Sequence, residues 1–383
     1  DAAGNAATVN TGTSFTYDIT APTISGGVAI TSGTGIQNNF LNAGDNVSVT
    51  VTFSENSPVT GTPQLTLAVG DDNQTATYAS SGSGGTTMVF QYMIQAGDND
   101  TNGISIRANA LALDNGTISD PAGNNAILTH SAVSDNNSYM VDTRAPTVNS
   151  FTISDTELLV GDNATVTLVF SEDVISFEAA DITNPNGSLP SMTSSDNITW
   201  SGTLTPTANT EDDNNTLSLD TSYTDLAGNA GPSETTSNYE VETWAPSVSS
   251  IVISSATGIQ NSFLNAGDEV SVTVTFRESV IVDNASGTST LTLVVGSTNR
   301  TAPYTSGSGG STLVFQYTIQ AGETDDNGIS IGADVLALNS GTIRDAVGNN
   351  ATLTHNAVSS NTSYKVDTTP PTISGGVAIT SAA

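Results

Sequence analysis

Carboxylates are the main chemical resource of this 383-residue chain. Thirty-eight Asp and Glu stand against six Lys and Arg, which gives a formal net charge of −32, and the chain has two His and no Cys. Disulfides and thiolate metal sites are therefore excluded, and Ser-His-Asp catalysis lacks a His within residues 146–245. Carboxylates can bind hard cations such as Ca²⁺, or act in pairs in glycoside hydrolysis.

The acids recur at equivalent places along the chain. A Phe-x-Glu sequence ends a strand-like segment three times, at Glu55, Glu172 and Glu278. The D-x-x-G-N motif begins at Asp1, Asp120, Asp225 and Asp345, and an acid precedes a Pro by four residues at Asp18, Asp142, Glu242 and Asp367. Like charges gathered together are unfavourable unless water solvates them or a cation bridges them, and Ca²⁺ accepts about six to eight oxygen ligands. We therefore predict calcium at the short linkers between repeats.

A second candidate is the loop Asp98-Asn99-Asp100-Thr101-Asn102-Gly103, which has the first half of a calcium-loop pattern. Oxygen-bearing side chains stand at positions 1, 3 and 5, and a Gly stands at the tight turn. The predicted ligands are Asp98, Asp100 and Asn102, then Glu211, Asp213 and Asn215, then Glu323, Asp325 and Asn327. Position 12 lacks the bidentate Glu and no helical pattern flanks the loops, so these are not EF-hands.

Both groups of acids have alternative interpretations. Asp, Asn and Gly are ordinary hairpin-turn residues, and duplicated domains copy their turns. Free salt could also offset the negative charge by screening alone.

The positions of these motifs divide the chain into repeats. Residues 22–145 and 246–370 are long repeats that share TGIQN-x-FLNAGD and VFQY-x-IQAG, and residues 146–245 are a shorter relative. We expect residues 1–21 to be the C-terminal end of a preceding repeat. Residues 371–383 are expected to begin a following one, because 371–381 are identical to 22–32.

Within each repeat the apolar residues have a period of two. Val47, Val49, Val51 and Phe53 alternate with Ser and Thr, and the same pattern recurs at 164–170 and 270–276. About seven such strands per repeat, separated by Gly, Asn and Asp turns, predict an all-β fold of tandem immunoglobulin-like β-sandwiches. Because the linkers are short and contain Pro, the domains should be arranged end to end as a rod.

Composition excludes several classes of protein. A net charge of −32 opposes nucleic-acid binding, and no apolar run has the length of a membrane-spanning helix. Acids that recur in every repeat indicate a structural role, so we predict that the chain is not an enzyme.

The junction V-D-T-x-A-P, the F-S-E strand end and D-x-A-G-N resemble the tandem bacterial immunoglobulin-like extender repeats of giant secreted adhesins of the RTX and biofilm type. The resemblance implies an extracellular location at the bacterial cell surface and a calcium-stiffened spacer whose partners are neighbouring repeats of the same chain. By position, the ligand sets it implies are Glu55, Asp120 and Asp142; Glu172, Asp225 and Glu242; and Glu278, Asp345 and Asp367. The chain departs from the pattern where Glu242 replaces Asp and where Arg277 replaces Ser beside Glu278.

Two other functions compete with the spacer. A repeat of a self-assembling filament or surface layer would use the same rods with lateral or end-to-end contacts between chains. A glycan-binding module would need an exposed aromatic platform, whereas aromatics make up 5 % of the chain and most fall on inward-facing strand positions.

Overall fold

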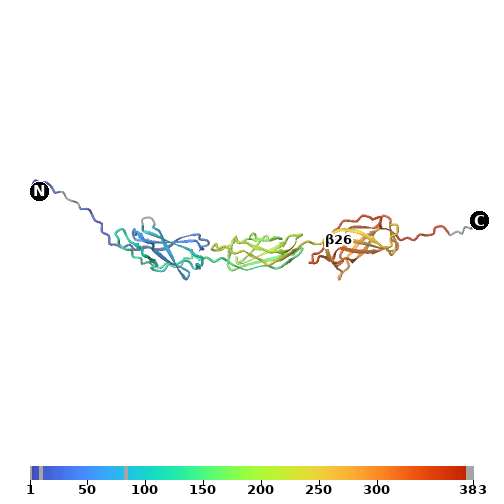
Figure 1. Cartoon of the computed structure of the whole chain (residues 1–383), viewed down its shortest axis with the longest axis horizontal. Helices are drawn as coiled ribbons and strands as arrows, with labels where there is room; N and C mark the ends of the chain where they lie inside the picture. Colours follow the sequence, from blue (N-terminus) through green and yellow to red (C-terminus); the bar gives the residue numbers. More distant parts are fainter. Residues whose placement is uncertain (1, 8–11, 82–84, 377–383) are drawn as a thin grey trace, which may run out of the picture.

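The computed structural model describes residues 2–7, 12–81 and 85–376. Asp1, which opens the first D-x-x-G-N copy, and residues 377–383 of the expected following repeat lie outside the described residues. Three β-domains follow one another in a row, and the two ends of the chain leave from opposite ends of the row (Figure 1). The predicted tandem immunoglobulin-like architecture is confirmed.

The period of two explains the longest strands. Along Asn46–Phe53 the four apolar side chains are buried while the Asn, Ser and Thr residues between them are partly exposed. The corresponding strands Ala164–Phe170 and Glu269–Asp283 follow the same rule. Burying one face of each strand supplies the hydrophobic stabilisation, and the polar face keeps the sheet soluble without added charge.

The first domain contains three sheets, with strand orders β1-β3-β7-β6-β5-β9, β10-β4 and β2-β11-β8. Leu41 of β2 and Val141 of β11 join the buried side chains of the large sheet in one core. Its strands are β1 (Ile24–Thr34), β2 (Phe40–Leu41), β3 (Asn46–Phe53), β4 (Val59–Thr60), β5 (Gln64–Val69), β6 (Asp72–Ser81), β7 (Thr87–Met93), β8 (Asn99–Asp100), β9 (Leu111–Ala112), β10 (Thr117–Ile118) and β11 (Met140–Asp142).

The second domain is built from shorter sheets around an aromatic core. Phe170 packs against Phe177 and Tyr223, and Phe177 also contacts Trp200 edge to face. The sheets are β12-β14-β18-β17, β13-β23-β19, β15-β21 and β16-β20-β22. The elements are β12 (Val148–Ile153), β13 (Glu157–Leu158), β14 (Ala164–Phe170), β15 (Val174–Ile175), the 3₁₀ turn η1 (Ala179–Asp181), β16 (Ile182–Thr183), β17 (Gly187–Ser188), β18 (Thr199–Pro206), β19 (Glu211–Asn215), β20 (Ser218–Leu219), β21 (Thr224–Asp225), β22 (Glu234–Thr235) and β23 (Tyr239–Glu242).

The third domain repeats the plan of the first. Its large sheet has the order β24-β26-β29-β28-β27-β31, with β32 also paired to β26, and the second sheet is β25-β33-β30. Strand β26 is labelled in Figure 1. The strands are β24 (Val248–Ala256), β25 (Phe263–Leu264), β26 (Glu269–Asp283), β27 (Thr290–Val295), β28 (Thr298–Ser306), β29 (Gly310–Thr318), β30 (Thr324–Asp325), β31 (Ser330–Ala337), β32 (Thr342–Arg344) and β33 (Lys365–Asp367).

The direction of the strands gives each domain two distinct ends. Because β1 and β3 are antiparallel and Ile24 lies opposite Phe53, the end of β3 returns to the end at which the domain begins. We call this end the upstream pole. Strand β11 instead runs parallel to β2 and leaves the domain at the opposite end, the downstream pole. Among the described residues, no helix is long and apolar enough to cross a bilayer.

Candidate cation sites at the domain junctions

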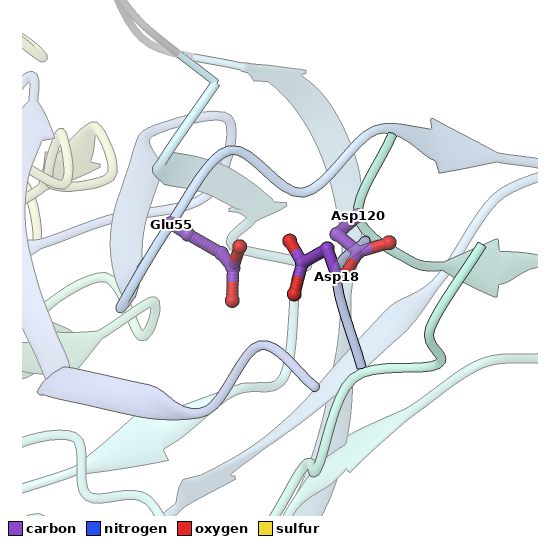
Figure 2. Close-up of side chains that lie close together, drawn as sticks. All are labelled: Asp18, Glu55 and Asp120. Carbon is purple, nitrogen blue, oxygen red and sulfur yellow. The ribbon is translucent and has the colours of Figure 1, made fainter. Parts of the chain in front are cut away.

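Two groups of three carboxylates meet at the upstream poles of the first and second domains. The groups are Asp18, Glu55 and Asp120, and Asp142, Glu172 and Asp225. Within each group, one carboxylate oxygen from each residue lies within 4.8 Å of the other two. Figure 2 shows the first group, in which the three side chains converge from three separate segments and the carboxylates of Glu55 and Asp18 face each other.

Each group is assembled from a linker and two loops. The linker acid enters from the chain that precedes the domain, the Phe-x-Glu glutamate follows the β3 or β14 strand, and the D-x-x-G-N aspartate lies on a turn at the same pole. The linker therefore places an acid of one domain against two acids of the next.

The D-x-x-G-N aspartates are held firmly by hydrogen bonds. In the second domain Asp225 Oδ1 accepts hydrogen bonds from the backbone N–H groups of Ala227 and Asn229, at 2.8 and 2.9 Å. Its Oδ2 accepts one from Asn229 Nδ2 at 2.8 Å. Desolvation acts to raise the pKa of the equivalent Asp120, but hydrogen bonds from Asn124, Gly123 and Ala122 outweigh it and lower the pKa. The hydrogen bonds therefore hold each of these carboxylates in a fixed orientation on its turn.

The Phe-x-Glu glutamates experience the opposite environment. Desolvation, followed by the negative charges of Asp142 and Asp225, raises the pKa of Glu172. Desolvation also raises the pKa of Glu55, with Asp18 and Asp120 adding to the effect. The folded protein thus pays an electrostatic cost for keeping these glutamates ionised, which a bound cation would remove.

The third domain gathers a related group at its upstream pole. Desolvation and the charges of Asp345, Glu242 and Glu211 raise the pKa of Glu278. The Oε1 atom of Glu278 is buried and has no hydrogen-bond partner. Arg277, which follows Phe276 in the sequence, is exposed, and its charge is not among those that act on Glu278.

The structure corrects the ligand sets that the family resemblance implied. Asp142 does not join Glu55 and Asp120 of its own domain, because β11 carries it to the downstream pole, where it meets Glu172 and Asp225. Likewise the negative charge of Glu242 acts on Glu278, together with that of Asp345. The linker acid of each set therefore belongs one domain further along, and Asp18 completes the first group. Its spacing of four residues before Pro22 matched the other linker acids and was the signal that pointed to it.

Asp367 has no triad in the described part of the chain. It lies at the downstream pole of the third domain, opposite Thr324 on β30, and its Oδ1 accepts a hydrogen bond from Thr369 N at 2.9 Å.

The carboxylates of the 98–103 loop accept hydrogen bonds from several protein donors. Asp98 accepts hydrogen bonds from Tyr92 Oη at 2.6 Å, Gln95 N at 2.9 Å and Gln74 Nε2 at 2.9 Å. Asp100 accepts from Gly70 N at 2.8 Å and, through its other oxygen, from Gly103 N at 2.8 Å. The Nδ2 of Asn102 donates a hydrogen bond to Asp135 Oδ2 at 2.6 Å. Both carboxylates are buried, and each accepts hydrogen bonds from protein donors through both oxygens. They therefore link the loop to neighbouring strands, and we call this arrangement a strut.

The equivalent loop of the third domain has the same construction. Glu323 accepts hydrogen bonds from Tyr317 Oη and Gln320 N and forms an ion pair with Arg300. Asp325 accepts from Gly296 N and Gly328 N. Asn327 bonds to Ser360 instead. These three predicted ligands therefore also have protein partners.

In the second domain the strand register corrects the predicted alignment. The linker acid lies opposite Asn99 in the first domain and opposite Glu211 in the second, so Glu211 corresponds to Asn99 and Asp212 corresponds to Asp100. Asp213 is exposed, and Asn215 is buried with its amide bonded to Asp212 O and Tyr239 O. Glu211 therefore does not align with Asp98, and its negative charge acts on Glu278 of the third domain.

Residues 142–241 match the family model of a bacterial Ig-like domain. No curated protein sequence matches the chain.

Three solved structures are similar in fold. A titin I9–I11 tandem is 9 % identical with a TM-score of 0.27, and the match covers 82 % of this chain and 93 % of that one. The Escherichia coli adhesin FdeC is 13 % identical with a TM-score of 0.26 and coverage of 91 % and 96 %. Three N-terminal domains of the bacteriophage RB49 outer capsid protein Hoc are 12 % identical with a TM-score of 0.27 and coverage of 90 % and 99 %.

Proposed function

We propose that this chain is a spacer segment of a bacterial surface adhesin, in which Ca²⁺ held at the domain junctions stiffens a rod of immunoglobulin-like domains. The observation that carries the proposal is the convergence of carboxylates from two successive domains on one point. The bacterial Ig-like match and the end-to-end arrangement support a spacer outside the cell.

The donor atoms suit calcium. Each group offers carboxylate oxygens without any thiolate or imidazole, which is the donor set of hard cations. The buried, unpartnered Oε1 of Glu278 fits the same interpretation, because a buried carboxylate oxygen without a donor is costly unless a cation replaces one. Loosely arranged groups on three separate loops favour Ca²⁺ over Mg²⁺, which demands near-octahedral geometry.

The mechanism we propose is mechanical. The D-x-x-G-N aspartate is fixed by hydrogen bonds from its own turn, and the glutamate follows the end of a core strand of the same domain. The linker acid belongs to the segment about which the domains would bend. Bound Ca²⁺ supplies positive charge at this point. The repulsion among the three carboxylates then becomes attraction, and bending the linker requires removing a ligand.

A thermal melt in EDTA and in millimolar Ca²⁺ tests this proposal. Trp200 packs in the core of the second domain, so its fluorescence follows the domain that contains Glu172 and Asp225. We expect Ca²⁺ to raise the melting temperature beyond the effect of Na⁺ at equal ionic strength. Equal melting temperatures in both media would refute calcium binding at this junction.

A matched pair of variants localises the effect. Glu172→Gln removes a candidate ligand, whereas Glu234→Gln changes an exposed glutamate of the same domain that bonds only to the neighbouring Thr235 N among the described contacts. The calcium-dependent shift should shrink in the first variant and persist in the second.

A further inference from the structure

The last residue of each D-x-x-G-N motif forms the same contacts at all three upstream poles. Asn124 Nδ2 donates hydrogen bonds to Asp120 Oδ2 at 2.7 Å and to the backbone oxygen of Asp18 at 3.2 Å. Asn229 Nδ2 donates to Asp225 Oδ2 at 2.8 Å and to the backbone oxygen of Asp142 at 3.1 Å. The amide therefore ties the motif's own aspartate to the backbone of the incoming linker.

Asn349 shows why an amide is needed. Its Nδ2 donates to Asp345 Oδ2 and to the backbone oxygen of Glu242, both at 2.9 Å. Its Oδ1 accepts a hydrogen bond at 2.8 Å from the backbone N–H of Val160, which lies on a turn of the second domain. The side chain is 3 % exposed, and both of its donors and its acceptor are used. Asp in this place would lose both donors and add a negative charge beside Asp345.

A second contact joins the same pole to the preceding domain. At the first junction, Asn38 Nδ2 and Asn42 Nδ2 donate to the backbone oxygens of Leu226 and Ala227, each at 2.9 Å. At the second junction the contact comes from the turn that contains Val160, whose backbone N–H donates to Asn349 Oδ1. A covalent linker alone lets two domains rotate about it. A further contact to one side of the linker fixes the angle between the two domains.

We propose that the D-x-x-G-N asparagines, Asn229 and Asn349 in particular, are positioning residues that set the angle between successive domains without any cation. The linker backbone is held by the amide, and the backbone carries the linker acid into its group. The carboxylates are thereby brought together before a cation neutralises them. This inference stands on the contacts of the amide and holds whether or not Ca²⁺ binds.

The experiment measures the distance between two spin labels in the full chain by pulsed electron paramagnetic resonance. Because the chain has no Cys, labels can be placed at Thr203→Cys and Ser255→Cys, two exposed positions in the second and third domains. In EDTA we expect a single narrow distance distribution for the parent chain. Asn349→Ala should broaden it, and Asn349→Asp should broaden it at least as much. Asn299→Ala, at an exposed Asn of β28, should leave it unchanged.

Thermal melts of the same variants separate positioning from folding. We call the proposed action of these asparagines the clamp. If Asn349→Ala keeps the third domain folded but gives the parental distance distribution in EDTA, the clamp is refuted. If Asn349→Ala unfolds that domain, the corresponding comparison with Asn229→Ala, using labels in the first and second domains, decides the matter in the same way. A parental distribution that Ca²⁺ leaves unchanged would count against the calcium proposal but not against the clamp.

Discussion

The aspartate and the glutamate at each junction face the same point but are prepared in opposite ways. Asp225 is surrounded by donors that stabilise its charge, whereas the pKa of Glu172 is raised by desolvation and by the two neighbouring carboxylates. One carboxylate is held in place by hydrogen-bond donors, and the ionised form of the other is disfavoured by its surroundings. A bound cation would relieve the repulsion between the glutamate and its neighbouring carboxylates.

Replacing that glutamate should therefore raise the stability of the second domain in EDTA and lower it in Ca²⁺. In EDTA, Glu172→Gln removes repulsion and should raise the free energy of unfolding by about 0.5 kcal/mol, a small value because solvent screens a partly exposed site. In Ca²⁺ the variant loses a ligand and should bind about tenfold more weakly, or about 1.4 kcal/mol. Urea unfolding of Trp200 fluorescence measures both. Equal changes in both media would contradict the assignment of Glu172 as a ligand.

The raised pKa of Glu172 also predicts a dependence on pH. Because its pKa is higher in the folded domain than in the unfolded chain, the folded state binds more protons in the range just above the ordinary value of 4.5. In EDTA, stability should rise as pH falls from neutrality into this range. In Ca²⁺ the stabilisation by the cation should fall over the same range, because protonation removes a ligand.

Melts at a series of pH values between about 5 and 7 test this. The lowered pKa of Asp120 does not interfere, because the stability it contributes is lost only below the ordinary value of 3.8. Stability that falls together in both media as pH decreases would contradict the prediction.

At the scale of strands and loops, the period of two in the sequence predicted which segments form strands and which side chains are buried. Alternation along residues 46–53 and 269–276 fixes which side chains enter the core, and the structure buries them as expected. Periodicity does not tell which pole a loop occupies, so it cannot correct the grouping of Asp142 with Glu55 that the family resemblance implies. That assignment depends on the antiparallel pairing of Ile24 with Phe53 and the parallel pairing of Phe40 with Met140.

The 98–103 loop shows a second limit of sequence patterns. Asp at alternate positions before Gly is typical of a calcium loop, but it is equally typical of a turn whose carboxylate caps backbone N–H groups. The partners that decide between the two, Gly70 and Gln74, lie on other segments of the chain. Local spacing therefore cannot distinguish a ligand from a strut.

Asp100→Asn tests the strut. Asp100 is 3 % exposed and accepts hydrogen bonds through both oxygens, so an amide nitrogen in place of one oxygen would face a donor. We expect a loss of about 1 to 3 kcal/mol in the stability of the first domain. The loss should be equal in EDTA and in Ca²⁺, as measured by differential scanning calorimetry. A loss found only in Ca²⁺ would restore the calcium loop.

The strand register also makes the two junctions within the chain unequal. Glu211 lies opposite Glu242 on the paired strand, where the first domain places Asn99 opposite Asp142. Like charges directly opposite are destabilising, by roughly 0.2 to 1 kcal/mol. Glu211→Asn should therefore stabilise the second domain in EDTA and weaken calcium binding at the second junction. Isothermal titration calorimetry of this variant and of the reciprocal Asn99→Glu, which should tighten the first junction, measures the effect.

At the scale of the molecule, two kinds of contact resist bending between domains. The amide contacts of Asn229 and Asn349 act in any medium, whereas the carboxylate groups repel without a cation and attract with one. Small-angle X-ray scattering should therefore show an extended chain in both media, with a longer maximum dimension in Ca²⁺ than in EDTA. Glu172→Gln combined with Glu278→Gln should remove that difference, while Glu234→Gln should preserve it. Identical scattering of the parent chain in Ca²⁺ and EDTA would mean that proline, packing and the amide contacts alone set the stiffness, and the carboxylates at the junctions would then be solvated anions.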